Sequence, residues 1–313
     1  MGLVLVTGAA GFLGGAILLA LRRAGHAVRA TWHRHEPRVR AADVDWQRDD
    51  LCADRDRSAG LLLGVDTVVH LAARVHISGM RRYWSNPFQR ANVLATRRLA
   101  QQSQSAGVRR FIFMSTIGVH GSENRIERGM PTPMQATDPV RPNSAYARSK
   151  LAAEQALSEI RGTGPMQLIT LRAPLVFGPG NGGNFLRLLG ALDHGLPLPI
   201  GSQPAPRSLV YVENLADLLV ACVQRPEVAQ RTFLLADFDL TVTALAGKLA
   251  ALLGRRLRSV RLPDWLLIGG ALRSLTRPLL VDARPIRAAT GWQPAVAPDE
   301  ALARTLAWYR SAR

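Results

Sequence analysis

Short apolar runs alternate with longer amphipathic stretches along the first half of the chain. Five runs have the length and apolar character of buried strands, at residues 2–6, 27–31, 67–71, 110–114 and 167–171. The segments 12–23, 87–106 and 144–160 lie between them and carry apolar residues at helical spacing. Such alternation predicts an α/β fold, in which helices cover both faces of a doubly wound parallel sheet.

The pattern changes after residue 172. Gly and Pro become frequent between Pro174 and Pro206, which indicates loops over a site. Residues 207–224 have the pattern of a strand and a helix that return to the first domain, and the rest indicates small helices ending in an amphipathic one. We therefore predict a first domain of residues 1–172 plus about 207–228, and a smaller discontinuous C-terminal substrate domain of 173–206 plus about 229–313. Ligands of doubly wound sheets bind beyond the carboxyl ends of the strands, so a cleft is expected between the two.

The first predicted strand runs into a glycine-rich turn, residues 7–14, that opens the first helix. Gly8 allows the tight turn, Gly11 lets backbone N–H groups approach a pyrophosphate, and Gly14 lets helix and strand pack closely. This spacing alone is a weak signal, since glycines also mark flexible loops. The strand before it and the helix after it favour a Rossmann-type dinucleotide site, with Phe12 and Leu13 beside the ligand.

The composition is strongly basic, with a formal net charge of +17 over 313 residues. A basic surface can bind nucleic acid. Here the arginines are spread along the whole chain without interleaved aromatic residues, and only two of the 40 basic residues are lysines. We interpret this as a compositional bias and predict no nucleic-acid partner. The positive field can still accelerate the encounter with a small diphosphate-bearing substrate.

The cysteines and apolar runs bear on the cellular setting. Cys52 and Cys222 lie far apart without metal-type spacing, which indicates reduced packing residues and a cytoplasmic setting. No apolar run reaches the ~20 residues that span a bilayer, and the N-terminus has no secretion signal, so we predict no integral membrane segment. Residues 264–277 could attach peripherally to a membrane, but a core-facing helix is the favoured interpretation.

One of the two lysines, Lys150, lies four residues after Tyr146 and therefore on the same face of the predicted helix. An ammonium is a compact charge that can lie beside a phenol, lower its pKa and bond a ribose hydroxyl, which a forked guanidinium cannot do. Tyr146 would then act as a proton donor and acceptor. Two solvated neighbours on a helix are the alternative, and the glycine turn favours the catalytic interpretation.

Together these segments resemble the extended short-chain dehydrogenase/reductase family, in its nucleotide-sugar epimerase/dehydratase branch. The matching pieces are residues 7–14, Asp50-Leu51, His70-Leu71-Ala72-Ala73, Asn92, Ser115-Thr116, Tyr146 with Lys150, 172–180 and 207–212. The resemblance implies that Asp50 and Leu51 flank the adenine and that Asn92 belongs to the site framework. It also implies coenzyme contacts at Leu71, Ala72, Ala73 and Pro174, a substrate contact at Arg74, and a homodimer.

Thr116 stands where this family has its catalytic Ser or Thr, whose hydroxyl bonds the substrate oxygen that Tyr146 protonates. A strand-capping hydroxyl is the alternative. Dehydratases of the family carry an Asp-Glu pair directly afterwards, where this chain has Ile117 and Gly118. Neither can move a proton, so the resemblance implies hydride chemistry at a single carbinol carbon.

The resemblance extends to the substrate. Asn184 and Arg207 match positions that hold the nucleotide diphosphate, although a surface arginine is the alternative for Arg207. Leu175 stands where galactose epimerases of the family have an asparagine. Segments 68–76, 184–199 and 207–217 are similar to bacterial enzymes that reduce UDP-4-keto-6-deoxy-N-acetylglucosamine for surface polysaccharide. A UDP-sugar 4-epimerase, a reductase of another carbonyl compound and a non-catalytic dinucleotide sensor are the alternatives.

The end of the second predicted strand bears on the coenzyme. An acidic residue there normally selects NAD by bonding the ribose 2′-hydroxyl. This chain has none at residues 31–35, whereas Arg34 and His33 could receive a 2′-phosphate. We therefore predict NADP(H) as the preferred coenzyme, with NAD(H) as the alternative. His33 and His35 lack neighbours that would complete a ligand set, so no metal is predicted.

Overall fold

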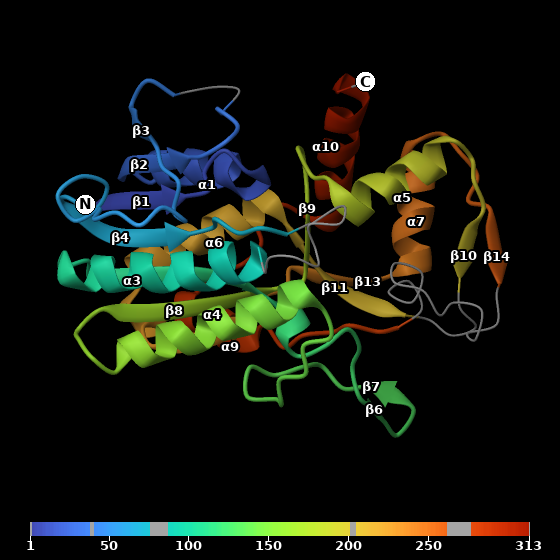
Figure 1. Cartoon of the computed structure of the whole chain (residues 1–313). Helices are drawn as coiled ribbons and strands as arrows, with labels where there is room; N and C mark the ends of the chain where they lie inside the picture. Colours follow the sequence, from blue (N-terminus) through green and yellow to red (C-terminus); the bar gives the residue numbers. More distant parts are fainter. Residues whose placement is uncertain (1, 38–40, 76–86, 201–204, 262–276, 313) are drawn as a thin grey trace.

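The central element is a parallel sheet of seven strands, in the order β3-β2-β1-β4-β5-β8-β12 (Figure 1). The computed structural model describes residues 2–37, 41–75, 87–200, 205–261 and 277–312. The strands are β1 (Leu3–Thr7), β2 (Ala27–Trp32), β3 (Val44–Arg48), β4 (Val65–His70), β5 (Arg110–Thr116), β8 (Gln167–Ala173) and β12 (Arg231–Leu234). All six pairings are parallel, and the chain changes direction across the sheet between β1 and β4. The predicted doubly wound α/β fold is confirmed.

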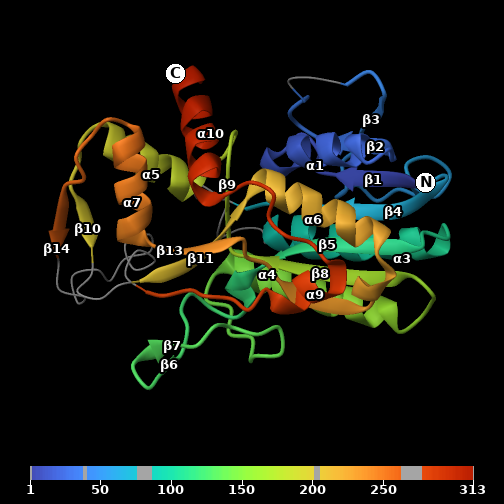
Figure 2. The same cartoon turned by 180° about the vertical axis from the view of Figure 1, so that it is seen from behind.

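Helices cover both faces of this sheet. Figure 1 shows α3 (Ala95–Ser105) and α4 (Ala145–Arg161) on the near face, and Figure 2 shows α1 (Phe12–Arg23) and α6 (Val212–Gln224) on the other. Ile17 of α1 and Leu219 of α6 are fully buried in one core cluster, and Leu99 of α3 and Leu157 of α4 belong to another. The apolar stripe of each helix therefore faces the sheet, as the sequence periodicity predicts.

A smaller unit lies beyond the carboxyl ends of the strands. It contains a three-stranded sheet of β9 (Leu175–Phe177), β11 (Pro206–Tyr211) and β13 (Phe238–Thr241), together with the parallel pair β10 (Leu198–Ile200) and β14 (Ser259–Arg261). The helices α5 (Gly183–Asp193), α7 (Val242–Leu252) and α10 (Pro298–Ser311) pack around them (Figure 1). Its core contains Phe177, Phe185, Leu249 and Leu306.

The strand pairings differ from the predicted grouping of two segments. Strand 207–211 was expected in the first domain, but β11 pairs with β9 and β13. Residues after 229 were expected in the smaller domain, but β12 pairs with β8 at the edge of the central sheet, and α9 (Arg284–Thr290) packs against it. A run of four residues carries too little periodicity to reveal which sheet it joins.

The remaining elements are short. They are the 3₁₀ turns η2 (Ile117–Val119) and η3 (Pro226–Val228) and the hairpin of β6 (Ile126–Glu127) and β7 (Met130–Pro131). Most of segment 264–277 lies outside the described residues, so its predicted helix is untested. Within the described part of the chain, no helix has the length and apolar character needed to cross a membrane.

Candidate active site

A cavity of about 900 Å³ opens at the carboxyl edge of the central sheet and is lined by the glycine turn, β2, the segments after β3 and β4, and α4. It brings together fourteen of the residues predicted from sequence: Gly8, Gly11, Phe12, Leu13, His33, Arg34, Asp50, Leu51, Leu71, Ala72, Ala73, Arg74, Tyr146 and Lys150. Residues from separate parts of the chain therefore share a single cavity large enough for a sizeable ligand.

The glycine turn has the geometry of a phosphate cradle. Gly8 has a positive φ of 71°, and a Cβ there would lie 2.8 Å from the backbone of Ala72. A Cβ on Gly14 would lie 1.9 Å from the carbonyl oxygen of Ala9, so Gly14 acts in packing and does not line the cavity. Gly11 is the N-cap of α1, and no side chain caps this helix end. Its backbone donors and positive dipole end therefore suit a pyrophosphate.

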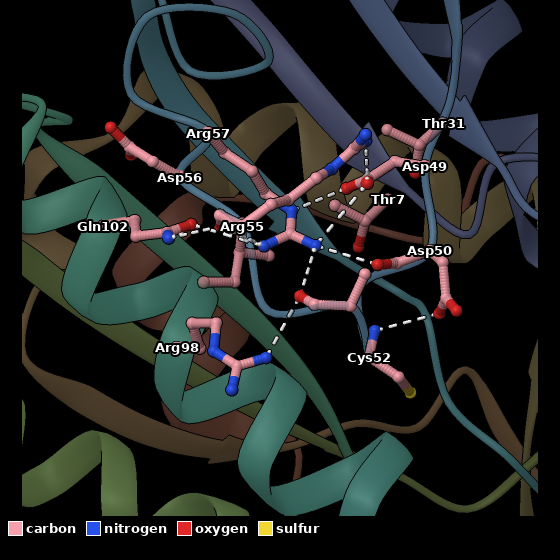
Figure 3. Close-up of polar contacts among 12 residues, drawn as sticks. Thr7, Thr31, Asp49, Asp50, Cys52, Arg55, Asp56, Arg57, Arg98 and Gln102 are labelled. Carbon is pink, nitrogen blue, oxygen red and sulfur yellow. Dashed lines mark hydrogen bonds and ion pairs between the residues drawn. The ribbon is translucent and has the colours of Figure 1, made fainter.

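A buried ion pair lies at one end of the cavity, where Asp49 belongs to the lining. Figure 3 shows the polar contacts of this pair. Arg57 Nε donates to Asp49 Oδ2 at 2.7 Å, and both side chains are at most 2 % exposed. Arg57 Nη2 also donates to the carbonyl oxygens of Asp50 at 2.8 Å and Ala53 at 3.2 Å. These bonds fix the loop that presents Asp50 and Leu51 to the cavity. Asp49 and Arg57 were not predicted as site residues, because one arginine among so many gives no signal of burial.

Cys52 was predicted to be a packing residue, but it lies at the cavity. It lines the cavity beside Asp50, and its backbone N–H donates to Asp50 Oδ1 at 3.0 Å. Burial raises the pKa of the Cys52 thiol, which therefore stays protonated at neutral pH. Only Cys222 is a core packing residue as predicted, and both cysteines are free.

The end of β2 contributes His33, Arg34 and His35 to the same part of the cavity. His33 Nε2 lies 3.6 Å from Asp50 Oδ2. The Asp50 carboxylate, from the segment after β3, therefore lies beside the end of β2. The described residues contain no group of three His, Cys, Asp or Glu side chains placed to hold a metal ion.

The other end of the cavity is built by α4. Ser144 caps this helix by accepting from the backbone N–H of Ala147 at 3.1 Å, which places Tyr146 and Lys150 in its first two turns. Lys150 is 2 % exposed, and its Nζ lies 4.1 Å from the ring centroid of Phe113. Both side chains line the cavity with the glycine turn.

The expected lowering of the tyrosine pKa is wrong for this geometry. Burial raises the pKa of Tyr146 to about 12. Burial also lowers the pKa of Lys150 to about 7, against the opposing charge of Glu154. Burial thus disfavours the charged form of both groups, and the charge of Glu154 favours the charged form of Lys150.

Asn92 belongs to the framework behind the cavity. It lies in the π-helix η1 (Gln89–Leu94), where the sequence predicted an ordinary helix over 87–106. Asn92 Oδ1 accepts from the backbone N–H of Arg74 at 2.7 Å, and its Nδ2 donates to Ser149 Oγ at 2.9 Å. Ser149 in turn donates to the carbonyl oxygen of Tyr146 at 2.7 Å. The π-helix therefore connects the segment after β4 to the turn of α4 that contains Tyr146 and Ser149.

Four other predicted residues also lie outside the cavity lining. Thr116 ends β5, and its Oγ1 accepts from the backbone N–H of Gly118 at 3.2 Å, which is the capping geometry. Pro174 is buried after β8, and Asn184 is exposed in the first turn of α5. Arg207 Nη1 donates to the carbonyl oxygen of Arg277 at 2.9 Å, and burial lowers the arginine's pKa to about 10. Their assigned contacts with coenzyme or substrate stay predictions.

The cavity also contains residues that the sequence analysis missed. They include Val75, Pro87, Arg90, Met114, Val176 and Asn181. Asn181 follows β9 in the glycine-rich loop, and its Nδ2 donates to the carbonyl oxygen of Val176 at 2.9 Å. Such residues reach the cavity through the fold, and no short motif marks them.

The sheet order, the uncapped helix after the glycine turn and the shared cavity define a dinucleotide-binding protein of the Rossmann class. The profile of the NAD dependent epimerase/dehydratase family matches residues 4–236, and the chain belongs to this family.

Three relatives illustrate its range. A UDP-glucose 4-epimerase of Vibrio cholerae is 30% identical over 96% of this chain and 94% of its own. A ceramide reductase of Caulobacter vibrioides is 30% identical over 99% of this chain and 95% of its own. The solved structure of MoeE5 in complex with UDP-glucose and NAD is 28% identical, covers 99% of both chains and superposes with a TM-score of 0.81.

Proposed function

We propose that this protein is an NAD(P)-dependent oxidoreductase acting at C4 of a nucleotide sugar, and that it reduces a UDP-4-keto-6-deoxy-N-acetylhexosamine in polysaccharide biosynthesis. The observation that carries the proposal is that Tyr146 and Lys150 open onto the same cavity as the glycine turn. A proton donor and a dinucleotide cradle in one cavity are what carbonyl reduction needs. The relatives named for UDP-glucose support the substrate class.

The residues present fit a nicotinamide dinucleotide, because Gly8 and Gly11 line the cavity and no side chain caps the start of α1. The turn and this helix end would hold the pyrophosphate, Asp50 and Leu51 the adenosine, and Lys150 the nicotinamide ribose. When bound, the coenzyme supplies or accepts a hydride. Tyr146 gives a proton to the oxygen at C4, and Thr116 positions that oxygen.

The segment after Thr116 restricts the reaction. Ile117 is buried, and Gly118 contributes only its backbone N–H to the Thr116 hydroxyl. Elimination of water across two carbons needs a further acid and base, which these two positions cannot supply. The proposed chemistry is therefore confined to one carbinol carbon.

We further propose NADP(H) as the preferred coenzyme. His33 and Arg34 line the cavity at the end of β2, where a 2′-phosphate would meet the Arg34 guanidinium and the His33 ring. The acidic Asp50 is 3.6 Å from His33 and would oppose this preference in part. Titration of the protein with NADPH and with NADH should give a lower Kd for NADPH, and equal or reversed values would contradict this assignment.

A UDP-sugar 4-epimerase is the second candidate, supported by the name of the Vibrio cholerae relative. An epimerase retains its coenzyme and rotates a keto intermediate within the site. Leu175, which is 38% exposed at the start of β9, occupies the position of a substrate-binding asparagine in galactose epimerases and favours the reductase.

Coenzyme stoichiometry separates the two candidates. Incubation with UDP-4-keto-6-deoxy-N-acetylglucosamine should consume added NADPH in equal amount, as followed by its absorbance. An unchanged absorbance would exclude the reductase. In parallel, UDP-glucose and UDP-N-acetylglucosamine are incubated without added coenzyme and separated by chromatography, where a new epimer would establish the epimerase.

The substrate class has its own test. UDP should raise the melting temperature, because a ligand that binds only the folded state stabilises it. The ceramide reductase relative makes another carbonyl compound the alternative, and an unchanged melting temperature with UDP would favour it. The homodimer and the cytoplasmic setting stay predictions, and sedimentation of the purified protein measures the first.

A further inference from the structure

Four polar side chains form a buried network behind the catalytic end of the cavity. They are Ser115, His120, Glu154 and Arg172, and none of them lines the cavity itself. Ser115, His120 and Arg172 are 4%, 6% and 7% exposed, and the Glu154 side chain is 9% exposed. We call this group the Glu154 network.

The network is closely hydrogen-bonded. Arg172 Nη2 donates to Glu154 Oε2 at 2.6 Å, its Nε donates to Oε1 at 3.2 Å, and the Ser115 hydroxyl donates to Oε1 as well. Arg172 Nη1 lies 2.7 Å from His120 Nε2 and donates to the carbonyl oxygen of Ala136 at 3.1 Å. A guanidinium can only donate, so His120 Nε2 accepts and the ring is neutral. Burial and the charge of Arg172 both lower the pKa of His120.

Glu154, Ser115 and Arg172 each lie within one to four residues of a predicted site residue in the sequence. Glu154 lies one helical turn after Lys150 on α4, and Ser115 directly precedes Thr116. Arg172 lies opposite Ser115 in the pairing of β5 with β8, two residues before Pro174. The network therefore joins the three segments whose relative placement decides where the catalytic groups lie.

Stability alone does not require such a network. Replacing a buried ion pair by apolar side chains of similar volume is often neutral or stabilising. We propose that Glu154 is a positioning residue for Tyr146 and Lys150: fixed by Arg172 and Ser115, its carboxylate keeps the neighbouring lysine charged and keeps α4 aligned with the ends of β5 and β8. The catalytic consequence rests on the proposed function, whereas the effect on the lysine does not.

The groups that face Lys150 determine the sign of the effect. On α4 they are Tyr146, which is neutral, and Glu154. On β4 it is His70, whose pKa burial and the charge of Lys150 lower to about 3, so that this ring is neutral too. On β5 it is the apolar ring of Phe113. Among the residues that the structure describes, Glu154 is thus the negative charge that opposes the effect of burial on Lys150. Its removal should let Lys150 lose its proton at lower pH.

The composition makes this effect directly measurable. Lys150 and Lys248 are the only lysines of the sequence, so protein labelled with ¹³C and ¹⁵N in lysine gives two side-chain signals by NMR. Lys248 pairs with Asp299 on the surface and serves as an internal reference. In Glu154→Gln we expect the Lys150 titration midpoint to fall by about one pH unit, within the range for loss of a nearby opposite charge.

The matched control is Glu159→Gln. Glu159 lies on the same helix, but its side chain is 66% exposed and pairs with Arg97 on the surface. This variant should leave the Lys150 midpoint unchanged. An unchanged midpoint in folded Glu154→Gln, or an equal shift in Glu159→Gln, would overturn the proposal. Since no substrate is needed, this outcome is independent of the proposed reaction.

A second variant covers the case in which Glu154→Gln does not fold, because it leaves Arg172 buried without its charged partner. The double variant Glu154→Leu/Arg172→Leu replaces the pair by apolar side chains. Its Lys150 midpoint should also fall, since the carboxylate is the charge that acts on the lysine. A purely structural role would change the melting temperature and leave the midpoint in place, which would overturn the proposal.

Kinetics extend the test to the reaction. If the proposed function holds, kcat of Glu154→Gln should fall at pH 8 relative to the unaltered protein and recover as the pH is lowered, with KM for the sugar nucleotide unchanged. A uniform loss at every pH would contradict a role of Glu154 through the charge of Lys150.

Discussion

A buried arginine–carboxylate pair lies at each end of the coenzyme cavity. The two pairs differ in the sequence distance and in the elements that they connect. Asp49 and Arg57 lie eight residues apart and bond within one loop (Figure 3). Glu154 and Arg172 connect a helix to a strand and continue to Ser115 and His120. The local pair fixes a loop that lines the cavity, whereas we propose that the long-range pair aligns the elements that carry Tyr146 and Lys150. Changes at the first end should therefore affect stability and binding, and changes at the second should affect chemistry.

The largest effect on chemistry is expected from Tyr146→Phe. Loss of the hydroxyl removes proton transfer, so kcat should fall by about 10³-fold or more, at the upper part of the range for a general acid. The Kd for the coenzyme, measured by calorimetry, should stay within about twofold, because the rest of the cavity is intact. A variant that keeps its kcat would remove Tyr146 from the mechanism.

At the other end, Asp49→Asn should mainly affect stability. It leaves Arg57 buried beside a neutral partner, which costs about 3–5 kcal/mol in comparable pairs. Urea unfolding should reveal the loss, together with weaker coenzyme binding and a kcat that is retained at saturating coenzyme. Asp43→Asn, which breaks the exposed pair with Arg22, is the control and should unfold like the unaltered protein. Equal behaviour of the two variants would contradict the role of the buried pair.

Lys150→Arg should reduce kcat by about 10²-fold although the positive charge is kept. The guanidinium is larger and forked, and it cannot occupy the compact position 4.1 Å from the Phe113 ring. Steady-state kinetics at several pH values give the measurement. Full activity of this variant would mean that charge alone suffices at the catalytic end.

The smallest effect is expected at the rim of the adenosine end. Arg34→Ala should weaken NADPH binding by about tenfold, the loss of one charge-assisted contact, and leave NADH binding nearly unchanged. Fluorescence titration with both coenzymes measures the ratio. Equal weakening of the two would show that Arg34 does not contact a 2′-phosphate.

The sequence was most informative where structure is local. The helix predicted over 12–23 is α1, and the glycine turn before it has the geometry inferred from its spacing. Partner choice across a sheet is non-local, so the sequence did not reveal that β11 pairs with β9 and β13, or that β12 pairs with β8. The pKa of Tyr146 was also misjudged, because burial depends on the whole fold. Arg57 and Arg172 could not be distinguished from the exposed arginines by sequence alone.

The most direct test of the central claim follows a labelled hydride. The protein is incubated with the 4-keto UDP-sugar and NADPH that carries deuterium at the transferable position, and the product is examined by NMR. We expect one deuterium at C4 of the sugar for each coenzyme oxidised. Product without deuterium at C4, or deuterium at another carbon, would contradict it.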